Sequence, residues 1–265
     1  MPCLKEQVLL RTTNDLIDCT ISATDGRIGR VRDCYFDDET WVIRYLVVDT
    51  GTWLSSRKVL IPPSSTVTPN WAKQLLSVRM TRQQVEDSPD IDTDRPVSRQ
   101  HERTLLKHYD YPCYWNGSEP LNDGAAIHDD QHLRSSEAIT NYHVRATDGQ
   151  LGHVASQLFD ENWNIRYLIA NTSDWWLGHE VLIAPQWIAD VRWDDRTVAV
   201  SLTRDAVKHS PHYHARTQLN RDEEIRLHSH YRLPGYWASE VKLQNPEFRV
   251  VAGPSSATTH DRSMR

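Results

Sequence analysis

The sequence has no long apolar run. Its mean hydropathy is −0.63, and no stretch approaches the roughly 20 apolar residues that a membrane-spanning helix needs. Near the N-terminus the apolar patch covers only Val8 to Leu10, whereas a signal peptide needs about 7–15 apolar residues. We therefore expect no transmembrane segment and a cytoplasmic protein, with a peripheral position at the inner membrane as the alternative location.

Basic residues are fewer than acidic ones, and no two cysteines are spaced as a metal-binding or dithiol pair. The chain has 30 Lys and Arg against 36 Asp and Glu, a formal net charge of −6. Because nucleic-acid affinity comes from cations that neutralise phosphates, this balance argues against a nucleic-acid partner. No two cysteines have C-x-x-C spacing, so the sequence predicts no zinc or dithiol site, and no cofactor is expected. The cysteines are Cys3, Cys19, Cys34 and Cys113.

Common catalytic motifs are missing as well. The sequence has no G-x-S-x-G nucleophile elbow, no H-E-x-x-H zinc motif and no G-x-x-x-x-G-K-[ST] phosphate loop. Two acidic pairs are repeated, Asp37-Asp38 and Asp160-Glu161. They follow strands, where a carboxylate that bonds its own backbone explains them. We therefore predict no catalytic residue and favour a protein that is not an enzyme.

What the sequence does contain is an internal repeat. TWVIRYLVVDTGTWL at 40–54 is matched by NWNIRYLIANTSDWW at 162–176. The match runs from a Thr-Asp-Gly triplet in each copy to HYDYPCYW and HYRLPGYW, in the same order and with one single-residue gap. Ordered agreement over this length indicates a duplication. The predicted organisation is a first unit at 5–115, a linker at 116–137, a second unit at 138–240 and a partly disordered tail at 241–265.

Local patterns within each copy predict short strands. The triplet at 24–26 is typical of a hairpin turn, because glycine accepts a positive φ. In WVIRYLVVD, the alternate residues Trp41, Ile43, Tyr45 and Val47 share one face, and this period of two favours a strand. Further strands are expected at Ile28–Phe36, Lys58–Ile61 and Leu75–Met80, with counterparts at Leu151–Phe159, Glu180–Ile183 and Val198–Leu202. Several short strands at this spacing predict a mainly β, α+β fold with two small β-barrels.

Helical signals follow the strands in each copy. Thr81 and Gln84 fit a capping box, in which each side chain bonds the backbone of the other residue. Ser98 and Asn220 are predicted N-caps of a second helix in each copy, and Glu223 completes a capping box with Asn220. Each unit is thus expected to carry a helical C-terminal extension.

One arginine alternates into an apolar strand of the first copy. Arg44 lies between Ile43 and Tyr45, and a semi-buried guanidinium needs an acidic partner. The sequence offers Asp33 or Asp49 for this role.

The stretch DGRIGRVRDCYFDDETWVIRYLVVDTGTWLSSRKVLIPP at 25–63 resembles the PRC-barrel domain. The resemblance rests on two turn glycines, a strand ending in Phe-Asp, the RYL strand and VLIPP. In the first copy, the residues that match are Gly26, Gly29 and Phe36-Asp37. In the second copy they recur as Gly149, Gly152 and Phe159-Asp160, followed by IRYL and VLIAP. That family includes the cytoplasmic domain of the photosynthetic reaction-centre H subunit and a domain of a ribosome maturation factor. The resemblance implies a fold used mostly for binding and assembly, while fold alone does not establish function.

The leading hypothesis is a tandem PRC-barrel protein that acts as a non-enzymatic scaffold or adaptor. It would bind a protein partner or a small ligand, with its two repeats paired intramolecularly and a homo-oligomer as a further option. The alternative is an accessory factor of photosynthetic or respiratory electron transfer with a quinone contact, by analogy with the H subunit. A metal-dependent enzyme and an RNA-processing factor are the less favoured hypotheses.

The repeated H-Y-x-x-P-x-Y-W block supplies the first candidate site. Its aromatic residues are Tyr114, Trp115, Tyr236 and Trp237. They fit either a pocket for a flat ligand such as a quinone or a hydrophobic extension that packs over a barrel, and packing is the favoured interpretation.

Histidines supply a second candidate site. His209, His212 and His214 lie close together in KHSPHYHAR and could offer imidazole ligands to a metal. The first copy has Asp87, Asp90 and Asp92 at the equivalent positions. Because an acidic and an imidazole site prefer different metals, solvated loop residues are the favoured interpretation, and no metal is expected.

Overall fold

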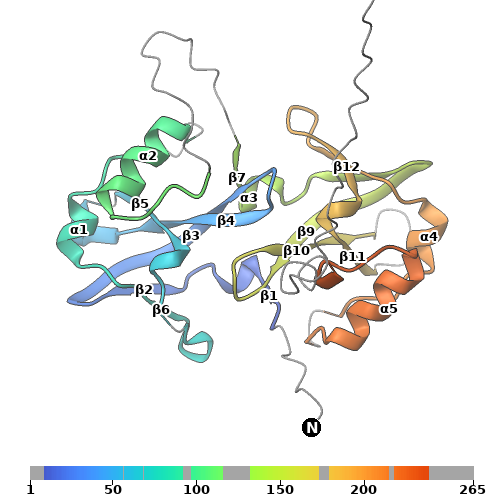
Figure 1. Ribbon diagram of the computed structural model, residues 1–265, viewed down its shortest axis with the longest axis horizontal. Coiled ribbons are helices and arrows are strands. Elements are labelled where there is room, and N and C mark those ends of the chain that lie inside the picture. Colours follow the sequence, from blue (N-terminus) through green and yellow to red (C-terminus); the bar gives the residue numbers. More distant parts are fainter. Residues whose placement is uncertain are drawn as a thin grey trace, which may run out of the picture.

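The computed structural model describes residues 9–55, 57–67, 69–91, 97–115, 132–172, 179–214 and 218–238. Figure 1 shows two units side by side, with helices at the two opposite ends of the molecule. One end carries α1 (Arg82–Glu86) and α2 (Arg99–His108), and the other carries α4 (Arg204–Lys208) and α5 (Arg221–Tyr231). The fold is mainly β with short helices, as the sequence predicts. Among the described residues, the helices are too short and too polar to cross a bilayer.

The sheet of the first unit follows the order β5-β4-β3-β2-β6. Its strands are β2 (Thr20–Ala23), β3 (Gly26–Asp37), β4 (Val42–Asp49), β5 (Lys58–Ile61) and β6 (Leu75–Ser77). β6 runs parallel to β2, whereas the other neighbours are antiparallel. Both faces of β4 are buried, as Tyr45 and the adjacent Leu46 show. This double burial accounts for the nearly continuous apolar run in the strand.

The sheet of the second unit repeats this order as β11-β10-β9-β8-β13, with β12 added at the edge. Its strands are β8 (His143–Ala146), β9 (Gly149–Phe159), β10 (Ile165–Asn171), β11 (Glu180–Ile183), β12 (Ile188–Arg192) and β13 (Thr197–Val200). β13 runs parallel to β8, as β6 does to β2. Short 3-10 turns lie at Thr13–Asp15, Gly51–Leu54, Pro63–Ser65, Trp71–Lys73 and Pro185–Trp187.

The predicted strands and their first turn are confirmed, although β6 ends at Ser77 and β13 at Val200, before the predicted Met80 and Leu202. β2 and β3 are joined by a two-residue turn, after which Gly26 has a φ of 148°, and Gly149 has the same angle. Residues with a Cβ rarely adopt this conformation. Among the described residues, no strand pairing joins β5 to β6 or β11 to β12, so a closed barrel is not seen in this part of the chain.

The helices begin where the sequence predicts. Thr81 and Gln84 form the capping box of α1: the Gln84 amide donates to the Thr81 hydroxyl at 3.2 Å, and the Thr81 amide donates to the Gln84 side chain at 2.9 Å. Asn220 and Glu223 do the same for α5, at 3.0 and 2.9 Å. Ser98 caps α2. Local side-chain chemistry therefore fixes these helix starts.

The two units exchange short N-terminal strands. β1 (Arg11–Thr12) pairs with β9 of the second sheet, and β7 (Leu133–Ser135) pairs with β3 of the first. Figure 1 shows β1 and β7 in the middle of the molecule, between the two sheets. β7 and the start of α3 (Ser136–Ile139) lie within the stretch expected to be a linker. The sequence does not reveal this difference, because a three-residue strand carries too little periodicity.

A second reciprocal contact joins the units at the start of β4 and β10. The Ile43 amide donates to the Trp163 carbonyl at 2.8 Å, and the Ile165 amide donates to the Trp41 carbonyl at 2.7 Å. Trp41 and Trp163 both have a positive φ, 56° and 65°. The equivalent turns therefore bond each other across the junction.

Buried polar groups complete the junction. The Thr13 hydroxyl donates to the Gln157 side chain at 2.7 Å, and the Ser136 hydroxyl donates to the same oxygen. Asp33 accepts from the Ser135 hydroxyl at 2.6 Å and from the Glu137 amide at 3.1 Å. Burial raises the pKa of Asp33, although these hydrogen bonds oppose the rise. Because unpaired buried polar groups are costly, this network holds the units in one arrangement.

Candidate functional site

The first conspicuous cluster surrounds a buried glutamate of α2. Glu102 is fully buried, and its carboxylate accepts from the Tyr114 hydroxyl at 2.7 Å. His132, which precedes β7, places Nε2 at 2.6 Å from the same carboxylate. The start of the second copy is thereby attached to the helix of the first unit.

The second unit repeats the cluster on α5. Glu224 is buried and accepts from the hydroxyls of Tyr167 at 2.9 Å and Tyr236 at 3.0 Å, and it lies 2.9 Å from the Arg221 guanidinium. Burial raises the pKa of Glu224, while Arg221 and the two phenols act in the opposite direction. Here the histidine differs: His228 on α5 contacts the Tyr167 hydroxyl at 3.0 Å.

The predicted aromatic residues divide into two separate pairs. Tyr114 meets Trp115 edge-on at 4.7 Å between ring centroids in the first unit, and Tyr236 meets Trp237 at 5.1 Å in the second. Burial raises the pKa of Tyr114 and of Tyr236, with the neighbouring glutamate adding to the rise in each case. Both phenols therefore stay protonated at neutral pH and donate to their glutamates.

Arginines cover the rings of both tyrosines. The Arg44 guanidinium carbon lies 3.7 Å from the Tyr114 ring centroid, and that of Arg166 lies 3.9 Å from the Tyr236 centroid. Cation–π contacts of this kind stabilise a packed arrangement. The arrangement supports the packing interpretation, and a flat-ligand pocket at these rings stays a prediction.

The acidic partner predicted for Arg44 is wrong. Its guanidinium donates to the Thr40 hydroxyl at 3.1 Å and covers Tyr114. Asp33 bonds the β7 segment, and Asp49 accepts from the Gly51 amide at 2.9 Å. The aromatic face takes the place of a carboxylate, because a guanidinium is weakly hydrated and stacks well.

Trp237 borders a surface cavity on α5. The cavity has a volume of about 490 Å³ and is lined by Ile225, His228, Ser229, Arg232, Leu233, Gly235 and Trp237. Ile225 is 39% exposed and Leu233 is 36% exposed. We call Ile225, Leu233 and Trp237 the α5 patch. The first copy has Arg103 and Tyr111 where the second has Ile225 and Leu233.

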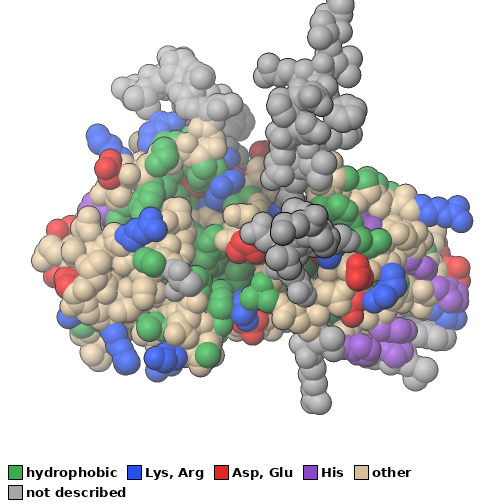
Figure 2. Space-filling model, turned by 60° about the horizontal axis from the view of Figure 1, so that its bottom comes forward, with side chains coloured by type: hydrophobic (Ala, Val, Ile, Leu, Met, Phe, Trp, Pro, Cys, Tyr) green, Lys and Arg blue, Asp and Glu red, His purple; other side chains and the backbone are tan. Residues whose placement is uncertain are grey.

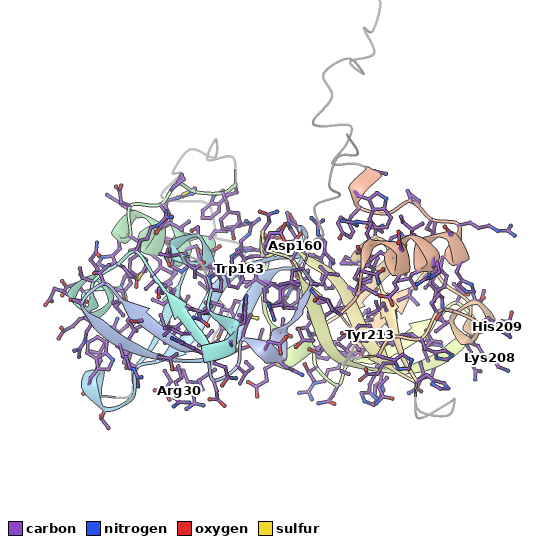
Figure 3. All side chains as sticks on the ribbon, turned by 90° about the horizontal axis from the view of Figure 1, so that it is seen from below. Arg30, Asp160, Trp163, Lys208, His209 and Tyr213 are labelled. Atoms are coloured by element: carbon purple, nitrogen blue, oxygen red, sulfur yellow. The ribbon has the colours of Figure 1, made fainter. Side chains whose placement is uncertain are left out.

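The three candidate histidines are exposed. His209 contacts Asp205 of the preceding helix α4 at 3.4 Å, and His212 packs on His179 with 4.1 Å between ring centroids. Burial and the neighbouring histidines lower the pKa of His212. Figure 3 places His209 beside Lys208 at one end of the second unit. In the described part of the chain, no three His, Cys, Asp or Glu side chains are grouped to hold a metal ion.

A further cavity lies where the two units meet, and we call it the junction cavity. Its volume is about 310 Å³, and it is lined by Leu9, Arg11, Pro63, Ser64, Thr66, Val67, Pro69, Trp71, Phe159, Asp160, Glu161 and Trp163. Figure 2 shows hydrophobic side chains gathered where the units meet, at the centre of the face in view. Figure 3 places Asp160 and Trp163 near the middle of the molecule. Both units therefore contribute to one apolar site.

Flat rings form the walls of the junction cavity. Phe159 and Trp163 of the second unit are stacked, with centroids 5.3 Å apart and planes at 10°. Trp71 of the first unit faces Phe159 at 6.3 Å. The Arg11 guanidinium carbon lies 4.6 Å from the Trp71 ring centroid. The site combines planar apolar surface with the positive charge of Arg11 and, at its rim, the carboxylate of Glu161.

Asp160 lines this wall, and its carboxylate is held by neighbouring residues. Its carboxylate accepts from the amides of Asn162 at 2.9 Å and Asn164 at 3.0 Å, and pairs with Arg166 at 2.6 Å. Asp37 of the first copy likewise accepts from the Thr40 amide at 2.8 Å. The turn role predicted for the repeated acidic pairs is confirmed at these two positions.

Sequence reasoning missed the buried glutamates and Arg11. Glu102 and Glu224 occupy equivalent positions in the two copies, as do Arg99 and Arg221, so their repetition was a usable signal. Arg11 gave none, because its role depends on a tryptophan 60 residues further along the chain and on the pairing of β1 with β9.

Comparison with known proteins places a known domain in the first unit. A protein from Deinococcus radiodurans, described as uncharacterized, is 53% identical over 36 residues, which is 14% of this chain. The matched stretch covers 13% of that relative's length. The family model of the PRC-barrel domain matches residues 11–72, a stretch that runs from β1 to the turn containing Trp71. A PRC-barrel domain is therefore present in the first unit.

Proposed function

We propose that this chain is a non-enzymatic scaffold, built from two PRC-barrel-like units, that binds a protein partner through the α5 patch. The observation that carries the proposal is the contrast between the copies: Ile225 and Leu233 are exposed apolar side chains where the first copy has Arg103 and Tyr111. Contiguous exposed apolar surface marks protein-binding sites. The repeated strand order supports the assignment of the second unit to the same kind of domain.

The exchange of β1 and β7 supports a scaffold role. Because each sheet includes a strand from the other copy, the two units form one body. A body of this kind holds the α5 patch at a fixed place relative to the first unit. Arg232 lines the cavity beside the patch, so the partner segment is expected to be apolar and to carry acidic residues.

The proposal is tested by affinity isolation from native extract, followed by binding measurements with each purified candidate. The double variant I225E/L233E should lose at least about tenfold in affinity, since it places carboxylates in an apolar contact. The variant R103E, at the equivalent surface of α2, should bind like the unmodified chain. Equal binding by all three proteins would refute the assignment to the α5 patch.

The electron-transfer alternative stays a prediction. It requires co-purification with membrane complexes or saturable quinone binding by the purified chain. A chain that neither co-purifies with membrane complexes nor shows saturation in a titration with a soluble quinone would remove it.

A further inference from the structure

The junction cavity has a counterpart on the other side of the unit junction. The second cavity, about 270 Å³, is lined by Asp38, Trp41, Pro185, Ile188, Ala189, Asp190, Val191 and Trp193. Trp41 and Trp193 there are the equivalents of Trp163 and Trp71. The stacking is also repeated, since Phe36 and Trp41 lie 5.3 Å apart at 23°. The duplication thus produced two similar aromatic sites.

The two sites differ in the partners of one arginine. In the second site, Arg134 lies over Trp193 at 4.3 Å and pairs with the Asp38 carboxylate at 2.7 Å. In the junction cavity, Arg11 lies over Trp71 in the same way, but no carboxylate among the described residues pairs with it. Its Nε is buried and has no hydrogen-bond partner in the described part of the chain. A buried donor without a partner is costly. The equivalent Nε of Arg134 donates to Asp38 at 2.7 Å, so the Arg11 Nε lacks the acceptor that its counterpart has.

We propose that the junction cavity binds a small aromatic monocarboxylate. One guanidinium stacked by its face on Trp71 leaves its N–H edge free for a carboxylate, which it matches with two parallel hydrogen bonds. One guanidinium pairs with one carboxylate, whereas a phosphate dianion would keep an uncompensated charge in an apolar cavity. The stacked Phe159–Trp163 pair and the facing Trp71 suit a flat ring system.

The size and rim of the cavity agree with such a ligand. Its volume of about 310 Å³ is at the lower end of small-molecule sites, which run from about 300 to 1,000 Å³, and gives room for a bicyclic ring. Leu9 and Val67 extend the apolar lining to the exposed rim. Glu161 is the exposed acid of the rim and the equivalent of Asp38, so it would compete with a ligand carboxylate for Arg11.

This inference goes beyond the scaffold role, and its test does not depend on a protein partner. The full chain is titrated with 2-naphthoate by calorimetry, and with 2-naphthalenemethanol as a neutral molecule of the same shape. Saturable binding of one naphthoate per chain is expected, with the alcohol weaker by at least about tenfold, because a charge-assisted hydrogen bond is lost. Absence of naphthoate binding, or equal binding of the alcohol, would overturn the proposal.

Variants locate the binding to one of the two sites. R11Q should weaken naphthoate binding by about tenfold or more, whereas R134Q at the equivalent position should leave it unchanged. E161Q should strengthen it, because the competing carboxylate is removed. Equal losses in R11Q and R134Q would contradict the assignment to the junction cavity. If R11Q does not fold, the comparison of acid and alcohol on the unmodified chain decides.

Discussion

At the scale of single residues, the buried carboxylate of Glu224 makes the stability of the chain depend on pH. Glu224 is 1% exposed and is held by two phenols and an arginine. Burial raises its pKa above the ordinary value of 4.5. Between these two pKa values, the folded chain holds a proton that the unfolded chain has released. Stability contributed by this proton is therefore present at low pH and is lost as the pH rises through the folded pKa.

The variant E224Q tests this linkage, because glutamine has no proton to titrate. The free energy of unfolding is measured by urea denaturation at a series of pH values. The stability of the unmodified chain, relative to E224Q, should be greatest below the ordinary pKa and should fall as the pH rises. Parallel stability curves for the two proteins would show that the pKa of Glu224 is not raised.

A second residue-scale prediction concerns the close approach of two strands. A Cβ added at Gly29 would lie 2.0 Å from the Asp49 carbonyl oxygen, and the equivalent Gly152 has the same contact with Asn171 at 1.9 Å. Because backbone atoms cannot move aside cheaply, G29A should destabilise the chain by about 1–3 kcal/mol or more. Urea denaturation measures this loss.

Gly51 supplies the matched control for G29A. It has a φ of 62°, and a Cβ there would meet nothing within 4 Å. G51A therefore carries only the conformational cost of the left-handed region, about 1 kcal/mol. A G29A variant as stable as G51A would mean that β3 and the end of β4 are further apart than the structure places them.

At the scale of elements, the N-terminal cap of α5 makes a contribution to the free energy of unfolding that can be measured. Asn220 and Glu223 form its capping box, and replacing an asparagine N-cap with alanine costs about 0.5–2 kcal/mol. N220A should lower the free energy of unfolding by this amount. S229A, at an exposed position within the same helix, should have little effect. Equal stability of N220A and the unmodified chain would contradict the role of the cap.

The element scale also shows how much the sequence alone can determine. Turns and caps were predictable because their chemistry is local: Gly26 for the hairpin and Thr81 and Asn220 for the helix starts. The strand core was predictable because its run of apolar residues repeats in both copies. β1 and β7 were not, since strands of two and three residues carry no readable period and are defined by partners in the other copy.

The same reasoning explains what could be foreseen of the sites. The aromatic block with Tyr114 and Tyr236 stood out by repetition, but the sequence could not show that arginines cover the rings, because Arg44 and Arg166 come from β4 and β10. The junction cavity was invisible for a related reason. Its walls come from both copies, and only the exchange of strands brings Arg11, Trp71 and Trp163 together.

At the scale of the whole molecule, the exchange of N-terminal strands makes the junction different from an ordinary contact between domains. Each sheet contains a strand of the other copy, and the turns at Trp41 and Trp163 bond each other through their backbones. Gln157 joins hydroxyls from both copies in a buried network. Contacts of this kind hold the halves together without help from the segment that connects them.

Halves of the chain cut between the units should therefore stay associated. We expect residues 1–131 and 132–265, co-expressed as separate chains, to purify as a one-to-one complex, because β1 and β7 each remain attached to the half that supplies the strand. Gel filtration measures the association, and hydrogen exchange at 35–37 and 158–159 reports the two exchanged pairings. The pair T13V/S136A, which leaves the buried Gln157 without its hydroxyl partners, should weaken the complex. Halves that elute separately, with unprotected amides at both pairings, would show that the connecting segment, rather than strand exchange, keeps the two units together.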